Sequence, residues 1–238
     1  MVYLIIGRRE QGKTTLAYRM ASKLPRRLIF DPRGMIGGKR VMTGSDLQAA
    51  CDRLADGEIQ EVIHTPFGDA QAGFVQFASE AQRWVLEYPD QPLAILVDEL
   101  AFVDTKVVAF QWAMRCCKRD TIHILMTAHR PADVQTYIRA LVDHWCLFAM
   151  RQEHDLDVIK ERCSVDVYTA VQALEPRCFV QWDDAHSTSK LYTDPASWYI
   201  ELQPERPGSG LSGPQGLDDL PSRDVATTAR VDTTPKLF

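Results

Sequence analysis

The sequence predicts an α/β fold with a mainly parallel central sheet flanked by helices. Three observations lead to this prediction: a glycine-rich motif follows the first apolar stretch, short apolar segments alternate with amphipathic ones, and one apolar segment ends in two acidic residues. Parallel strands joined by helices place their carboxyl ends at one edge of the sheet, where ligands bind. We therefore expect the chemically active residues to gather at that edge.

The glycine-rich motif comes directly after the predicted first strand, residues 2–6. Its spacing, G-x-x-x-x-G-K-T, and the helix expected to follow it as far as Pro25 are typical of a P-loop, or Walker A motif, which cradles phosphates with backbone N–H groups. Lys13 is expected to reach the β- and γ-phosphates of ATP, and Thr14 to bind Mg²⁺. The expected nucleotide-binding residues are Gly7, Arg8, Arg9, Glu10, Gln11, Gly12, Lys13, Thr14 and Thr15.

Composition favours a soluble cytoplasmic protein. The chain has 238 residues, of which 45% are hydrophobic, enough for one large domain with a full core. Its apolar runs are strand-length, far below the roughly 20 residues of a membrane-spanning helix, and the first strand leaves no room for a signal peptide. The six cysteines lack C-x-x-C spacing, so reduced core thiols are expected.

Charge restricts how the protein could contact nucleic acid. The formal net charge is −5, which argues against binding over the whole surface. Residues 19–40, however, contain seven basic side chains and one acidic side chain. Both a solvated basic face and a polyanion contact fit this local patch, and Lys39 and Arg40 are its candidate DNA contacts.

The remaining elements follow from hydrophobic periodicity and from glycine and proline positions. Strands are expected at 27–31, 61–64, 93–97, 121–127 and 145–150, with a closing pair at 177–182 and 189–192. Helices are expected at 46–54, 70–88, 104–118, 132–141, 155–162 and 166–174, the first capped by Asp46, and a mobile glycine-rich loop at 32–45. The globular domain should span 1–202, and the Pro/Gly/Ser/Thr-rich segment 203–238 should be a disordered tail.

The strand at 93–97 ends in Asp98-Glu99, 85 residues after Lys13, and matches a Walker B motif. Asp98 is expected to hold Mg²⁺ partly through water, and Glu99 to polarise the attacking water as general base. ATPases that perform mechanical work carry such a glutamate, which nucleotide kinases and small GTPases generally lack. A helix-capping acidic pair is the alternative explanation. The strands at 27–31 and 61–64, which lie between the two motifs in sequence, suggest a sheet with an additional strand inserted between the motifs.

A third cluster of polar residues follows the strand at 121–127. Thr127-Ala128-His129-Arg130-Pro131 occupies the position from which a side chain can contact the γ-phosphate and report its loss. His129 is the first candidate for this sensor and Thr127 the second. A histidine that only satisfies a turn is the alternative.

Three segments together resemble the FtsK/HerA superfamily of DNA-pumping ATPases. They are Leu96-Val97-Asp98-Glu99, the helix end at 114–120 (MRCCKRD) and the run at 122–134 (IHILMTAHRPADV). The resemblance covers residues 2–150 and implies a RecA/FtsK-like P-loop NTPase fold. His129 stands where that family usually has glutamine. The single-domain form resembles the genome-packaging ATPases of membrane-containing double-jelly-roll viruses.

The resemblance implies an ATP-hydrolysing translocase that packages double-stranded viral DNA without sequence preference, in the host cytoplasm or at a virion vertex. Such proteins work as ring oligomers, usually hexamers, and a capsid or portal-vertex protein is an expected partner. An arginine supplied in trans by the neighbouring subunit would be Arg119, or as second choice Arg115, although both also complement a helix dipole. Alternatives are an ATPase acting on protein during virion or secretion-complex assembly, a nucleotide phosphotransferase, and a plasmid or cellular DNA role.

Overall fold

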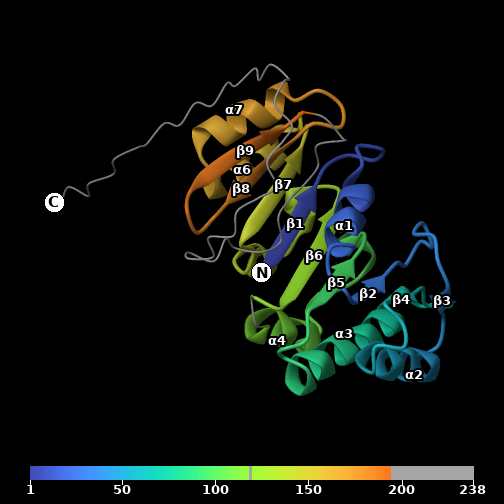
Figure 1. Ribbon diagram of the computed structural model, residues 1–238. Coiled ribbons are helices and arrows are strands. Elements are labelled where there is room, and N and C mark those ends of the chain that lie inside the picture. Colours follow the sequence, from blue (N-terminus) through green and yellow to red (C-terminus); the bar gives the residue numbers. More distant parts are fainter. Residues whose placement is uncertain (118–119, 194–238) are drawn as a thin grey trace, which may run out of the picture. The chain divides into compact units, whose positions relative to one another are not determined.

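The computed structural model describes residues 1–117 and 120–193, which form one sheet covered by helices on both faces (Figure 1). Within these residues the sheet has nine strands in the order β3-β4-β2-β5-β6-β1-β7-β8-β9. The strands are β1 (Val2–Ile6), β2 (Arg27–Phe30), β3 (Arg40–Val41), β4 (Glu61–His64), β5 (Leu93–Val97), β6 (Ile122–Ala128), β7 (His144–Phe148), β8 (Phe179–Asp183) and β9 (Thr188–Tyr192).

The sheet is parallel from β3 to β7, and β8 and β9 continue it as antiparallel strands. This confirms the predicted α/β class with a mainly parallel sheet. A strand is indeed inserted between β1, which leads into the P-loop, and β5, which leads into Asp98. The inserted strand is β6, however, whereas β2 and β4 lie outside β5. The additional strand is therefore the one that carries Thr127.

Successive side chains along each strand point to opposite faces of the sheet, so the domain has one hydrophobic core on each face. In β1, Val2, Leu4 and Ile6 point into one core, and Tyr3 and Ile5 into the other. Helix α1 (Lys13–Ala21) covers the Tyr3 face and lies beside β6 and β5 in Figure 1. The opposite core takes side chains from α2 (Gly44–Ala55), α3 (Ala70–Glu87), α4 (Val108–Cys116), α5 (Thr136–Arg139), α6 (Glu153–Arg162) and α7 (Val165–Ala173).

The prediction of a helix at 104–118 is wrong about where the helix begins. A short 3₁₀ helix, η1 (Leu100–Phe102), follows Glu99, and α4 begins only at Val108. The Asp104 carboxylate accepts the N–H of Lys106 at 2.9 Å, and the Asp104 N–H donates to Gln71 Oε1 at 2.6 Å. The local bond to Lys106 and the long-range bond to Gln71 both compete with helical hydrogen bonds, so the helix begins later.

Other elements also differ from the expectations, and most remaining strand and helix ends shift by one or more residues. The helix expected at 46–54 begins at Gly44 and is capped by Thr43, whose Oγ1 accepts the Asp46 N–H at 3.2 Å, so Asp46 lies in the first turn. The helix expected at 132–141 is divided into η2 (Pro131–Asp133) and α5. The glycine-rich segment 32–45 contains the strand β3, which pairs with β4.

Other structural expectations have mixed outcomes. All six cysteines are free, but Cys116 is exposed and so is not a core thiol. No helix among the described residues is long and apolar enough to cross a membrane. The predicted tail, 203–238, lies outside the described residues, so its disorder stays a prediction.

Candidate nucleotide-binding site

The P-loop connects the end of β1 to the first turn of α1. Gly12 has φ 98°, a left-handed conformation that favours glycine, and directly precedes Lys13 at the helix N-terminus. Gly7 is required for another reason: a Cβ there would lie 2.5 Å from the Phe148 Cβ. Gln11 ties the loop to the end of β7, because its Nε2 donates to the Ala149 carbonyl at 3.2 Å and its Oε1 accepts the Arg8 N–H at 2.7 Å. Gln11 therefore fixes the conformation of the loop between β1 and α1.

Asp98, at the carboxyl end of β5, faces the P-loop. The Thr14 hydroxyl donates to Asp98 Oδ1 at 3.0 Å, and the Thr127 hydroxyl donates to the same oxygen at 2.7 Å. Thr127 also accepts the Glu99 N–H at 2.8 Å. Thr127 is fully buried and does not line the cavity that lies in front of the P-loop. Thr127 therefore orients the Asp98-Glu99 pair. A phosphate sensor would instead have to face the cavity.

The donor set at Thr14 and Asp98 fits a hard cation such as Mg²⁺, which prefers oxygen ligands and keeps part of its water shell. Burial raises the pKa of the Asp98 carboxyl above its ordinary value. A bound cation would favour the ionised form that the buried site disfavours. Among the described residues no cluster of three or more His, Cys, Asp or Glu side chains forms a metal site.

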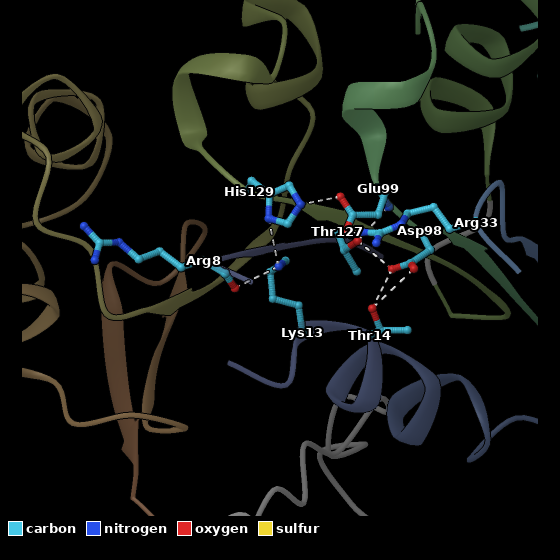
Figure 2. Close-up of polar contacts among 8 residues, drawn as sticks. All are labelled: Arg8, Lys13, Thr14, Arg33, Asp98, Glu99, Thr127 and His129. Atoms are coloured by element: carbon cyan, nitrogen blue, oxygen red, sulfur yellow. Dashed lines mark hydrogen bonds and ion pairs between the residues drawn. The ribbon is translucent and has the colours of Figure 1, made fainter. Parts of the chain in front are cut away.

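Glu99, His129 and Lys13 form a chain of contacts across the mouth of the P-loop (Figure 2). His129 Nε2 lies 2.7 Å from Glu99 Oε2, and Lys13 Nζ lies 3.2 Å from His129 Nδ1. An ammonium group can only donate, so Nδ1 accepts and the imidazole proton sits on Nε2, facing the carboxylate. Glu99 is held in the left-handed region, φ 58°, at the cap position of η1, yet its side chain makes no capping bond. This argues against the helix-capping explanation.

Arg33 belongs to this site and was not predicted from the sequence. Its Nη1 lies 3.4 Å from Glu99 Oε1, so Arg33 and His129 contact the two oxygens of one carboxylate. Arg33 follows β2, which pairs with β5, and so lies at the same edge of the sheet as Glu99. The available signal was a basic residue just beyond the end of a strand, but the neighbour of that strand could not be known from the sequence.

A cavity of about 730 Å³ joins these groups and is of a size suited to a nucleotide. Of the predicted P-loop residues, Arg9, Glu10, Gly12, Lys13, Thr14 and Thr15 line it, together with Asp98, Glu99 and His129. Burial lowers the pKa of the Lys13 ammonium, because desolvation disfavours its charge. Further basic side chains, Arg19, Arg33 and Arg177, complete a lining suited to a polyanion.

Several predicted residues lie elsewhere. Gly7, Arg8 and Gln11 shape the P-loop but do not line the cavity. Arg115 is exposed on the last turn of α4, and Arg119 lies outside the described residues, so the trans-arginine assignment stays a prediction. Lys39 and Arg40 do not line the cavity either, and Arg40 donates to the carbonyl oxygens of Gly34 and Ile36 within its own loop.

The sheet order with its inserted strand, the P-loop and the acidic pair facing it define the fold of a P-loop ATPase. No family model and no curated protein matches the sequence. Solved structures do match the fold. The genome packaging NTPase B204 from Sulfolobus turreted icosahedral virus 2, in complex with AMPPCP, superposes with a TM-score of 0.64 at 15% identity, covering 80% of this chain and 96% of that one.

Two other solved structures share the fold. VirB4 of Thermoanaerobacter pseudethanolicus has a TM-score of 0.56 at 11% identity and covers 82% of this chain and 90% of that one. The pCW3 conjugation coupling protein TcpA has a TM-score of 0.52 at 14% identity and covers 82% of this chain and 61% of that one. At these identities the likeness establishes the fold, and the activity has to be argued from the site.

Proposed function

We propose that this protein hydrolyses ATP and uses the energy to translocate double-stranded DNA, as a ring oligomer that packages a viral genome into a capsid. The proposal of ATP hydrolysis rests on one observation: His129 and Arg33 hold the Glu99 carboxylate beside Lys13. The fold shared with a genome packaging NTPase supports the choice of DNA as the substrate.

The side chains suit a hydrolytic mechanism. ATP would place its phosphates in the P-loop, and Lys13 would exchange His129 Nδ1 and the Arg8 carbonyl, its present partners, for phosphate oxygens. Mg²⁺ held by Thr14, and by Asp98 through water, would neutralise charge on the phosphates. The buried Glu99 carboxylate is held 2.7 Å from His129 Nε2 through Oε2, and an ionised carboxylate so positioned can accept the proton of an attacking water.

His129 is placed to couple the γ-phosphate to the rest of the domain. It contacts Lys13 and Glu99, and its neighbour Arg130 forms an ion pair of 3.1 Å with the buried Asp155 of α6. When Lys13 moves toward phosphate or back, His129 loses or regains a partner. The loop to η2 and α6 would transmit this change, which is the role expected of a sensor.

Steady-state ATP hydrolysis, with and without long double-stranded DNA, tests the proposal. Glu99→Gln should lower kcat by about two to four orders of magnitude, because the amide cannot accept the proton. Glu58→Gln is the matched control, since Glu58 is exposed and pairs with Arg53 far from the cavity. We expect DNA to stimulate the wild type, and the stimulation to weaken as salt rises.

Two outcomes would contradict the proposal. A fully active Glu99→Gln would refute the general-base assignment. Hydrolysis that is indifferent to DNA, over a range of salt and protein concentrations, would refute the translocase and leave an ATPase that acts on protein, or a phosphotransferase. Mixing Arg119→Ala with Glu99→Gln subunits tests the ring, because an arginine in trans predicts partial recovery of activity in mixed rings.

A further inference from the structure

A second cavity, of about 210 Å³, lies beside the P-loop at the carboxyl ends of β6 and β7. Four of its lining side chains are arginines: Arg8 and Arg9 from the P-loop, Arg130 from the segment after β6, and Arg151 from the segment after β7. Asp155, at the start of α6, is the one carboxylate among the described lining residues. Four arginines lining one small cavity are unexpected in a chain with a net charge of −5.

The carboxylate does not balance these charges. Asp155 is buried and already accepts both close contacts from Arg130 Nε, at 3.1 and 3.2 Å. Within residues 1–117 and 120–193, no carboxylate lies within 4.0 Å of the guanidinium of Arg8, Arg9 or Arg151. Arginine stays charged at every physiological pH, so three like charges remain uncompensated around this space. These three side chains are exposed, so water already screens part of their repulsion, and a bound anion would add charge-assisted hydrogen bonds.

The arginine-lined cavity adjoins the nucleotide cavity at the end where hydrolysis would occur. Arg9 and His129 line both cavities, and His129 contacts Glu99. Lys13, Thr14 and Thr15, which would hold the nucleotide, line only the larger cavity. In Figure 2 the Arg8 side chain extends away from Lys13, on the side of His129 opposite Glu99. The two cavities thus share the wall formed by Arg9 and His129, while the P-loop lysine and threonines serve only the larger one.

We propose that the arginine-lined cavity is a second phosphate site, distinct from the nucleotide cavity that Lys13 and Thr14 line. The inference rests on the proposed ATP hydrolysis, which releases inorganic phosphate at the His129 end of the nucleotide cavity. The chemistry recognised is a tetrahedral phosphate group, to which guanidinium binds in a bidentate manner. The group comes from one of two sources: the phosphate released by hydrolysis, or a phosphodiester of bound nucleic acid.

The test must separate this site from the P-loop, which also binds phosphate. The protein is first saturated with Mg²⁺ and an ATP analogue whose β- and γ-phosphorus atoms are bridged by methylene. The analogue fills the P-loop and the γ-phosphate position and cannot turn over. Inorganic phosphate is then titrated by calorimetry, at constant ionic strength, into the wild type, Arg151→Gln, Arg8→Gln and the control Arg53→Gln, a surface variant on α2.

We expect one phosphate per subunit in the loaded wild type, about tenfold weaker binding in Arg151→Gln and Arg8→Gln, and no change in Arg53→Gln. No phosphate binding to loaded wild type, or equal affinity in all four proteins, overturns the second site. Failure of the analogue itself to bind would instead refute the proposed function. Competition by a short oligodeoxynucleotide assigns the site to a nucleic-acid phosphodiester, and its absence assigns it to released phosphate.

Discussion

His129 Nε2 lies 2.7 Å from Oε2 of Glu99, while Nδ1 of the same ring lies 3.2 Å from the ammonium of Lys13. One imidazole therefore spans the two groups that would contact the γ-phosphate and the attacking water. Because Lys13 can only donate, its contact fixes the tautomer that presents an N–H to Glu99. The position of the base and the position of the P-loop lysine are thus linked through a single ring.

This link predicts how substitutions at His129 behave. His129→Gln should retain most of the kcat for ATP hydrolysis, because a carboxamide can also donate to Glu99 and accept from Lys13. His129→Ala should lose about 10- to 100-fold, since neither contact remains. Steady-state kinetics at saturating ATP checks both variants. Equal activity of the alanine and glutamine variants would mean that the ring has no role in hydrolysis.

Arg33 is expected to act as a positioning residue for Glu99. Removing its guanidinium leaves Glu99 Oε1 without its cation, so Arg33→Ala should lower kcat by about tenfold and change the KM for ATP less. Arg33→Lys should recover part of the loss, because a charge returns without the guanidinium geometry. A variant that changes only KM would show that Arg33 contacts the nucleotide and does not position the base.

Asp98 illustrates the cost of a buried charge in a functional site. Burial raises the folded-state pKa of this carboxyl, so its stabilising contribution is present at low pH and is lost as pH rises through the folded-state pKa. At pH 7 and without Mg²⁺ or nucleotide, Asp98→Asn should therefore unfold at higher urea concentration than the wild type. The same variant should be inactive. Urea titrations at pH 5 and pH 7 check this, and a destabilised Asp98→Asn at pH 7 would contradict it.

The buried His123, far from the site, is expected to make the stability of the fold depend on pH as well. The ring is fully buried, neither of its nitrogens has a hydrogen-bond partner within residues 1–117 and 120–193, and burial lowers its pKa to about 3. Between that value and the ordinary pKa of about 6.5, the unfolded chain binds the proton and the folded chain does not. Stability should thus fall as pH decreases below about 6.5, by up to about 1.4 kcal/mol per pH unit.

Replacing this ring removes the effect. His123→Leu should flatten the stability profile between pH 4 and 6.5, measured by urea unfolding, whereas the exposed His154→Leu should leave it unchanged. A profile as steep in His123→Leu as in the wild type would assign the acid sensitivity to other groups.

Much of the fold could be predicted because its signals are local. Strands β1, β5 and β6 are apolar runs of strand length, and α3 has regular helical periodicity. The predicted start of a helix was wrong where a side chain competes with the backbone for hydrogen bonds, as at Asp104. It was also wrong where Thr43, and not Asp46, caps the helix. Periodicity does not reveal such local hydrogen bonds.

The sequence by itself determined the P-loop, the acidic pair after β5 and the polar residue after β6, because the spacing of each motif and the strand before it are local properties. Only the tertiary structure decided that β6 lies between β1 and β5, that Thr127 orients Asp98, and that Arg33 and His129 hold the two oxygens of Glu99. The tertiary structure likewise decided that four arginines line a second cavity. The physical reason is that strand order and long-range pairing bring together residues far apart in the sequence. Arg8 and Asp155, for example, are 147 positions apart, and no local preference encodes their proximity.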